Sequence, residues 1–515
     1  MFNFNPVKKM KLLNKYKVFT LAAVAGLMST SCDLYYESPN EYQDYEVTNA
    51  AQLAVGMYNA YQKIPANEFY ITELRSDNMN SESGNGDPGL VQSWSYDANY
   101  GEASFYWANN YSVILNANYI IELEDEIAGD GGTGDKSLAE AYFMRALSHF
   151  NLVRTFERVP YIDAVLESVD DLDQFTLDFD NPTKEYLYNY LVNDLTTSID
   201  YFIAAGDNGT SNKANLGAAY AFLAKVYLSH PNKDYSAAYS VLSTYLHPDT
   251  NTFGYALEAT LEDVFDEDNE LNEEILFAVS YEPNSTPSVT SSIAFDDQVQ
   301  GQSQEWSFQM TEFGTGNGIV LTDDYINLVN SITDTSDGTV TYDSGETLRG
   351  MNNRIPYNND EYYYYLSPDR GDFYSGKHID TSETSGRDWI VLRYSDVLLL
   401  MCEAIMEGND TTDSDAIAFY NLVRERAGAT TLATDGTETL TQEMLLNERR
   451  IELVGENHRL WDLIRFGEAA AAQTLAEYGA SLGFTFSQKY LYFPIPQREI
   501  DATGGECEVY CQIFQ

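Results

Sequence analysis

The segment TLTQEMLLNERRIELVGENHRLWDLIRFG, residues 439–467, carries the most structural information in this chain. Thr439, with a glutamine three positions on, forms a capping box and predicts the start of a helix. Gly455 and Asn457 tolerate a left-handed backbone, so the helix is expected to break there. A second helix should follow, and Gly467 is its expected C-terminal cap. The segment is therefore predicted to be two helices joined by a tight turn.

Basic residues are concentrated in this segment, although the chain has only 29 Lys plus Arg against 80 Asp plus Glu. Arg459, Asp462 and Arg465 have the spacing at which helical side chains pair. Arginine also favours bidentate pairing with carboxylates at partly buried positions. We predict a structural ion-pair network formed by Glu448, Arg449, Arg450, Glu452, Arg459, Asp462 and Arg465. The alternative is that these arginines form an anion-binding or catalytic site.

ERRIEL, a short break and HRLWDLIRFG resemble the C-terminal signature of the SusD/RagB-like family, surface lipoproteins of Bacteroidetes-type bacteria that bind glycans or other nutrients. AEAYFMRALSHFNLVRTFERVPYI and RYSDVLLLMCEA resemble the usual helices of that family, and PIPQREID resembles its closing strand. Asn457 stands where the family usually has Gly, and Ala502–Gln515 departs from its usual tail. The resemblance covers nearly the whole mature chain, and its motifs are structural rather than catalytic.

Segments with helical periodicity recur in pairs along the chain, and small residues alternate with large ones within them. This alternation lets helices approach closely, as in stacked tetratricopeptide-type repeats. We predict a mainly α, SusD-like fold with tetratricopeptide-like helix pairs at about 48–250 and 389–467. A loop-rich insert with short strands is expected at about 253–388. The predicted helices are 48–64, 105–127, 138–156, 184–205, 213–229, 234–246, 389–407 and 415–427, with an irregular segment at 77–101 and a strand at 274–281.

Composition and motifs argue against several classes of function. The chain has 515 residues and a formal net charge of −51, so its surface repels nucleic acid phosphates and anionic lipid. Its 5 His show no metal-binding spacing, and the nucleophile-elbow, P-loop and dinucleotide motifs are missing from the sequence. We therefore expect a protein that is not an enzyme and has no cofactor. A Ca²⁺ ion in an acidic loop stays open, although residues 266–270 lack the glycine of an EF-hand turn.

The N-terminus resembles a bacterial lipoprotein signal. A lysine-rich start precedes a short apolar core and the small residues that lead to Cys32. We predict a signal peptide over 1–31, a mature chain over 32–515 and a lipid on Cys32, although Ser29 departs from the usual lipobox. The alternative is an ordinary secretory signal. Of the other cysteines, Cys402 is expected in the core, whereas Cys507 and Cys511 could pair in an oxidising compartment.

Polar loops that carry aromatic residues are the candidate ligand surface. Flat aromatic rings stack on the C–H faces of sugars, and loops on a rigid scaffold often carry binding function. The candidate ligand-binding residues are Asp77, Asn78, Trp94, Tyr96, Trp306, Phe308, Tyr363 and Tyr365. The alternative is that the tryptophans pack under their loops and that Asp77 and Asn78 cap turns. Trp107, Trp389 and Trp461 lie on predicted helices and are expected in the core.

The resemblance implies a glycan-binding lipoprotein of the outer membrane that faces the cell exterior. It would capture oligosaccharides or polysaccharides and pass them to a SusC-like, TonB-dependent transporter. Two alternatives use the same scaffold: binding of peptides or another nutrient, and a tetratricopeptide-type protein-interaction scaffold.

Overall fold

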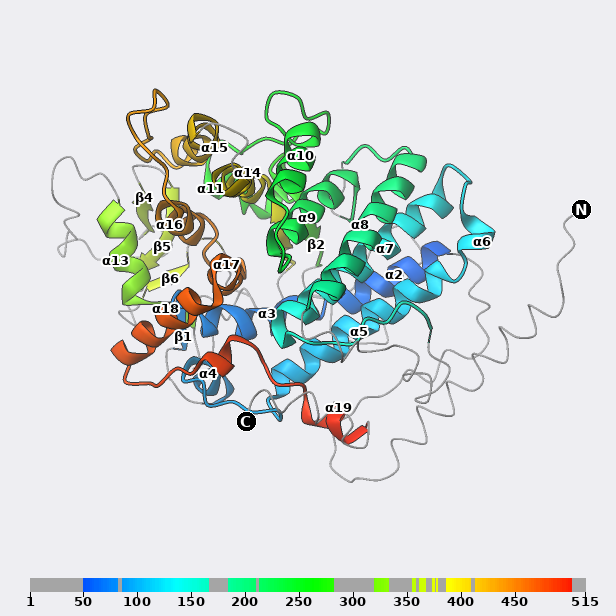
Figure 1. Cartoon of the computed structure of the whole chain (residues 1–515), viewed down its shortest axis with the longest axis horizontal. Coiled ribbons are helices and arrows are strands. Elements are labelled where there is room, and N and C mark those ends of the chain that lie inside the picture. The colour runs from blue at the N-terminus through cyan, green and yellow to red at the C-terminus, as the bar shows by residue number, and fades with distance from the viewer. Residues whose placement is uncertain are drawn as a thin grey trace, which may run out of the picture.

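Helices dominate the structure, as predicted, and successive helices pack side by side (Figure 1). A computed structural model of the chain describes residues 50–81, 86–165, 184–209, 213–281, 319–332, 354–357, 361–366, 373–375, 377, 386–408 and 413–502. The helices are α2 (Ala50–Tyr61), α3 (Ile64–Thr72), η1 (Glu73–Arg75), α4 (Gly86–Gln92), α5 (Gly101–Ile121), α6 (Glu124–Ile127), α7 (Thr133–Phe156), α8 (Glu185–Ala204), α9 (Leu216–Ser229), α10 (Tyr235–Tyr245), α11 (Leu261–Val264), η3 (Glu267–Asn269), α13 (Asp323–Ile332), α14 (Tyr394–Gly408), α15 (Asp413–Arg426), α16 (Gln442–Glu452), α17 (Arg459–Phe466), α18 (Glu468–Ser481), η5 (Gln488–Leu491) and α19 (Gln497–Ala502).

One continuous stack of helices joins the two halves of the sequence. α2 packs on α5, α5 on α7, α7 on α8, α8 on α9 and α9 on α10. α10 then packs on α14, which also contacts α15 and α16, although a long insert separates α10 from α14 in the sequence. The stack therefore brings the C-terminal helices against the N-terminal repeats.

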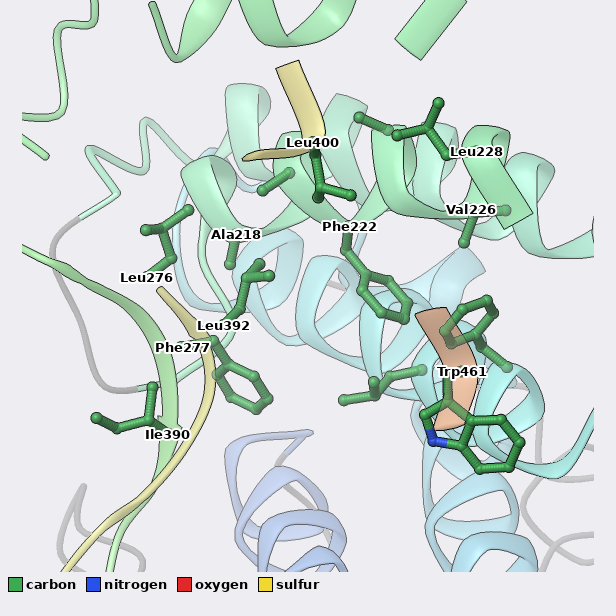
Figure 2. Packing of buried hydrophobic residues seen from close by; sticks show 14 of the residues in the cluster. Ala218, Phe222, Val226, Leu228, Leu276, Phe277, Ile390, Leu392, Leu400 and Trp461 are labelled. Atoms are coloured by element: carbon green, nitrogen blue, oxygen red, sulfur yellow. The ribbon is translucent and has the colours of Figure 1, made fainter. Parts of the chain in front are cut away.

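Small residues make the close packing of α9 possible. The side chain of Asn215 caps this helix by accepting a hydrogen bond from the amide of Ala218 at 2.9 Å. A Cβ added to Gly217 would lie 2.4 Å from the ring of Tyr255, so only glycine allows this approach. Figure 2 shows Phe222 of α9 in the core that also receives Trp461 of α17.

The strands within the described residues form three small antiparallel sheets. β1 (Met79–Ser81) pairs with β3 (Ile319–Leu321), in the register Met79 to Leu321. β2 (Ile275–Val279) pairs with β7 (Trp389–Arg393), and β5 (Glu361–Leu366) lies between β4 (Arg354–Tyr357) and β6 (Phe373–Ser375). The strand expected at 274–281 is thus confirmed as β2. Both of the first two sheets tie the insert to the helical scaffold.

Several predicted elements differ in the structure. Trp389 lies on β7 rather than on a helix, because WIVLR pairs with β2, yet its side chain is buried as expected. α4 and α13 are helices within segments predicted to be irregular, and α19 replaces the predicted closing strand. The cap of α16 is Thr441, which accepts from the amide of Met444, rather than Thr439.

Cys402 is buried on α14 as predicted, and its thiol contacts the carbonyl oxygens of Leu398 and Ala416. Cys32, Cys507 and Cys511 lie outside the described residues. In the described ranges, no helix combines the length and apolarity that crossing a membrane requires.

Candidate functional site

The break between α16 and α17 docks against the N-terminal helices. Gly455 and Asn457 have φ values of 74° and 63°, so both adopt the predicted left-handed backbone. The amide of Asn457 donates to the carboxylate of Glu73 at 2.8 Å, and its side-chain oxygen accepts from Thr72 at 2.6 Å. The turn is therefore held from outside by α3 and η1.

Buried ion pairs join α16 to α17 and α14. Arg449 donates to both oxygens of Asp462 at 2.8 and 3.0 Å and pairs with Asp396 at 2.8 Å. Asp396 also accepts from Lys225 of α9 at 2.9 Å. Arg465 pairs with Asp462 at 2.7 Å, as its spacing predicted, and with Glu403. Arg449, Asp462 and Arg465 thus form one buried network, which extends from the hairpin to two further helices, α9 and α14.

A second buried cluster centres on Arg393 at the end of β7. Arg393 pairs with Glu274 at 2.7 Å, with Glu452 at 2.5 Å and with Glu456 at 2.7 Å. Lys377 also contacts Glu456 at 2.6 Å. Burial alone would raise the pKa of Glu452, but the surrounding arginines outweigh it and lower the pKa to about 2. This cluster fixes the strand pair β2–β7 on α16.

Two arginines of α15 make three further ion pairs, with residues of α16 and with Glu274 beside β2. Arg424 of α15 pairs with Glu448 of α16 at 2.6 Å. Arg426 pairs with Glu274 at 3.0 Å and also contacts Glu452. No sequence spacing relates Arg393, Lys377, Arg424 or Arg426 to its partners, so these four residues were not predicted.

Asp77 is the buried centre of a third cluster. Arg459 donates to both of its carboxylate oxygens at 2.8 Å, rather than pairing with Asp462 as predicted. Arg450 donates to the carbonyl oxygen of Asp77 at 2.6 Å and to the side chain of Asn78 at 3.0 Å. Burial would raise the pKa of Asp77, but the two arginines hold it well below its ordinary value.

The placement of Asp77 and Asn78 contradicts the expectation that they face a ligand. Both side chains are buried, and arginines or Glu73 occupy their polar atoms. The carbonyls of the same two residues accept from Thr322, through its hydroxyl at 2.7 Å and its amide at 2.9 Å. Their role here is to join the insert to the helical hairpin.

Trp94 and Tyr96 are also buried, with 2% and 5% of their surfaces exposed. The ring of Trp94 packs edge-on against Phe486, with centroids 4.9 Å apart. Tyr96 packs against Phe493 at 4.2 Å. Neither ring presents a free face for stacking, so the expectation of accessible rings is wrong at these two positions. Their polar loops led to it, because the packing partners come from distant C-terminal residues.

The other predicted ligand residues lie in the insert. Trp306 and Phe308 are outside the described residues. Tyr363 and Tyr365 belong to β5, of which the described part is the backbone. Asp266, in the acidic run considered for Ca²⁺, accepts from the amide of Asp268 at 2.9 Å and begins η3. Within the described ranges, no three acidic, His or Cys side chains gather as metal ligands.

Two related family models together match most of the chain. The model of the SusD family matches residues 182–505. A second model, described as starch-binding associating with outer membrane, matches residues 37–228. SusD-like protein P2 of Formosa agariphila is 27% identical over 388 residues, 71% of this chain and 72% of that protein. A SusD-like protein of Bacteroides ovatus is 25% identical over 394 residues, 70% of this chain and 64% of that protein.

Solved structures show the same fold along most of the chain. A SusD homolog from Bacteroides thetaiotaomicron has a TM-score of 0.64 and 21% identity, covering 88% of this chain and 95% of its own. A laminarin-binding SusD-like protein has a TM-score of 0.63 and 20% identity, covering 88% and 97%. Surface glycan-binding protein A from Bacteroides thetaiotaomicron, in complex with laminarihexaose, has a TM-score of 0.61 and 20% identity with the same coverage. Because the SusD family model matches residues 182–505, more than half of this chain, the chain belongs to the SusD family.

Proposed function

We propose that this protein is a non-enzymatic, glycan-binding lipoprotein of the outer membrane, which passes captured saccharides to a SusC-like, TonB-dependent transporter. The observation that carries the proposal is the family match over residues 182–505. Two structural neighbours, one named as laminarin-binding and one solved with laminarihexaose, have folds that cover 88% of this chain. These relatives favour a saccharide over a peptide as the ligand class.

Three buried carboxylates of the ion-pair clusters support a structural rather than a catalytic role. The carboxylates of Asp77, Glu452 and Glu456 are buried and paired with arginine or lysine, which holds their pKa values below the ordinary range. A general acid for glycoside hydrolysis needs a raised pKa and access to its substrate. These carboxylates have neither, so their chemistry is that of structural anchors.

The insert is the proposed ligand-bearing part, because its described ends are fixed on the scaffold. The amide of Tyr281 donates to Asp388 at 2.9 Å, and its hydroxyl donates to the carbonyl of Gln62 at 2.7 Å. Further along, β3 pairs with β1. Trp306 and Phe308 fall between these two anchored ends in the sequence. We propose them, with Tyr363 and Tyr365, as the stacking residues.

The proposed membrane location rests on the predicted signal peptide over residues 1–31 and on the proposed lipid on Cys32. The test is a Cys32→Ser variant, because it removes the sulfur that carries the lipid. We expect this variant to leave the membrane fraction and to lose co-purification with the transporter. Retention of the unlipidated variant in the membrane would contradict the proposed anchor.

Affinity electrophoresis in gels that contain laminarin, starch, xylan or galactomannan tests the ligand class. Wild-type protein should be retarded by at least one of these neutral polysaccharides, and Trp306→Ala should lose that retardation. Phe105→Ala is the matched control, since Phe105 is an exposed ring on α5, 48% exposed. Wild-type protein that passes every gel unretarded while binding a peptide library would replace the glycan proposal with the peptide alternative.

A further inference from the structure

Two tyrosines share the outer face of α8. Tyr190 and Tyr201 are eleven residues apart, which corresponds to about 20° of rotation beyond three full turns and a rise of about 16 Å. Tyr190 is 43% exposed and Tyr201 is half-buried. Figure 1 shows α8 between α7 and α9 in the helical stack. The two rings therefore lie in line along one helix.

Each of these rings stacks on a second tyrosine. Tyr190 lies parallel to Tyr161, with centroids 4.3 Å apart and 11° between the planes. Tyr201 lies parallel to Tyr142 of α7, at 6.0 Å and 9°. Tyr161 in turn packs on the buried ring of His149 at 4.3 Å. The result is two ring pairs, Tyr161–Tyr190 and Tyr142–Tyr201, that we call the tyrosine pairs.

Carboxylates hold the hydroxyl groups of three of these tyrosines, Tyr161, Tyr142 and Tyr201. Tyr161 donates to Asp194 at 2.5 Å, and Arg145 holds the same carboxylate through two hydrogen bonds of 2.8 and 2.6 Å. Tyr142 and Tyr201 both donate to Glu124. The carboxylates thereby restrict these three side chains, and Tyr190 is ordered by its stacking on Tyr161.

Arg145 connects the inner rings of the two pairs. Its guanidinium lies 5.0 Å from the centroid of Tyr142 and 5.9 Å from that of Tyr161. Beside it, burial and the charge of Arg145 lower the pKa of His149 to about 3, so this imidazole is neutral at pH 7. Its Nε2 accepts from the amide of Ile162 at 3.1 Å while Nδ1 faces the carbonyl of Arg145. The support beneath both pairs is therefore rigid.

Short neutral side chains occupy the helix face between the pairs. Asn193 and Thr197 lie on the same side of α8, and Asn193 is exposed. The hydroxyl of Thr197 donates to the carbonyl of Asn193 at 2.9 Å. Asp194 also lies on this side of α8, but it is buried and paired with Arg145, so a flat chain can lie across Tyr190 and Tyr201 above it.

We propose that this face of α8 is a second saccharide-binding surface, on which a neutral polysaccharide chain stacks against Tyr190 and Tyr201. The inference rests on the proposed glycan-binding function and adds a site on the helical scaffold. Fixed rings lose little entropy when a ligand binds, which favours affinity. The net charge of −51 disfavours anionic polymers, and the glutamate and aspartate that hold the hydroxyls reinforce this preference.

Tyr245 of α10 provides a matched control. It is 40% exposed and stacks on Tyr220 at 3.8 Å and 4°, so it closely resembles Tyr190 as an isolated ring. The other tyrosines of α10, Tyr235 and Tyr239, lie about 80° and 120° away around the helix. No second ring of α10 is in line with Tyr245, so a chain stacked there would make a single contact.

The test measures the affinities for a polymer and for its hexasaccharide by isothermal titration. Laminarin and laminarihexaose are the first pair, and another pair is used if the gels show that the protein binds a different polysaccharide. The variants are Tyr190→Ala/Tyr201→Ala, Tyr190→Phe/Tyr201→Phe and Tyr245→Ala. A polymer can engage both surfaces at once and gain avidity, whereas the short oligosaccharide binds one surface at a time. We expect the double alanine variant to bind polymer about tenfold more weakly and hexasaccharide within about twofold of wild type.

The double phenylalanine variant should keep most of the polymer affinity because it keeps both rings, although it loses the hydroxyl of Tyr201 that Glu124 holds. Tyr245→Ala should bind like wild type. Unaltered polymer affinity in the double alanine variant would overturn the α8 site, while retardation lost in Trp306→Ala would still support the insert site. Equal losses in the alanine and phenylalanine variants would overturn stacking. Wild-type protein that binds no glycan would end both proposals together.

Discussion

The apolar core packed around α9 and the α16–α17 hairpin are both buried, but they are held by opposite chemistry. In that core, which Phe222 and Leu400 share, alanines and large apolar side chains are almost fully buried (Figure 2). In the hairpin, Arg449 and Glu452 are just as buried and are stabilised by paired charges. Apolar packing is non-directional and tolerates compensation, whereas each buried ion needs its partner in place. The hairpin should therefore be the less tolerant region.

The largest expected effect comes from breaking the hairpin at its centre. Arg449→Met leaves Asp396 and Asp462 buried without this cation, so we expect a loss of about 3–5 kcal/mol in unfolding free energy. Urea denaturation followed by circular dichroism measures it. Arg498→Met, at a solvent-exposed pair with Glu499, is the control and should change stability by less than about 1 kcal/mol. Equal stability of the two variants would contradict the contrast between the regions.

Asp388 and Glu452 should contribute to stability with opposite dependence on pH. Burial and the nearby Glu270 raise the pKa of Asp388 to about 7, the opposite of the arginine-paired Glu452. A raised carboxylate pKa stabilises the fold at low pH, and this contribution is lost as pH rises from about 4 to 7. The lowered pKa of Glu452 stabilises above about pH 4.5 and is lost as pH falls towards 2.

Asp388→Asn should therefore gain stability relative to wild type as pH rises, by on the order of 1–3 kcal/mol between pH 4 and pH 8. The asparagine can still accept from the amide of Tyr281 and donate to the hydroxyl of Ser280. Thermal melting of both proteins across this range measures the effect. A difference that stays constant with pH would show that Asp388 does not titrate there.

A shape-conserving change tests the tolerance of the apolar region. Leu400→Met on α14 keeps the volume of a fully buried side chain, so we expect a cost below about 1.5 kcal/mol in unfolding free energy. The corresponding conservative change in the hairpin, Arg449→Lys, loses the bidentate contact with Asp462 and should cost more. Urea midpoints rank the two variants, and the reverse order would contradict the comparison.

The smallest effect is expected where the network reaches solvent. Asp324 of α13 pairs with Arg450 at 2.8 Å, and its side chain is 60% exposed. Asp324→Asn should cost about 0.2–1 kcal/mol, and less at high salt, because exposed pairs are screened. Asp323→Asn, at the exposed neighbouring position on α13, is the control. Hydrogen exchange of α13 would show faster opening in the first variant and wild-type rates in the second.

Local patterns in the sequence were sufficient to predict most of the helix pairs, because periodicity and small residues depend on near neighbours. They also placed the left-handed turn at Gly455 and Asn457 and the Asp462–Arg465 pair. Partners that are distant in sequence were not predictable in this way. Asp77 was interpreted as a ligand residue, since nothing nearby in the sequence reveals that Arg459 neutralises it. Similarly, β7 depends on pairing with β2 rather than on its own pattern.

The contact between Trp94 and Gly479 has a consequence for how this chain can diverge. Trp94 has a φ of 49°, and a methyl group on Gly479 would approach its ring to within 2.6 Å. A residue larger than glycine fits at position 479 only if a smaller side chain replaces Trp94. The left-handed backbone at position 94 further limits the residue types that it can accommodate. Sequences that evolve from this one should therefore change positions 94 and 479 together, and a change at position 479 alone should be rare.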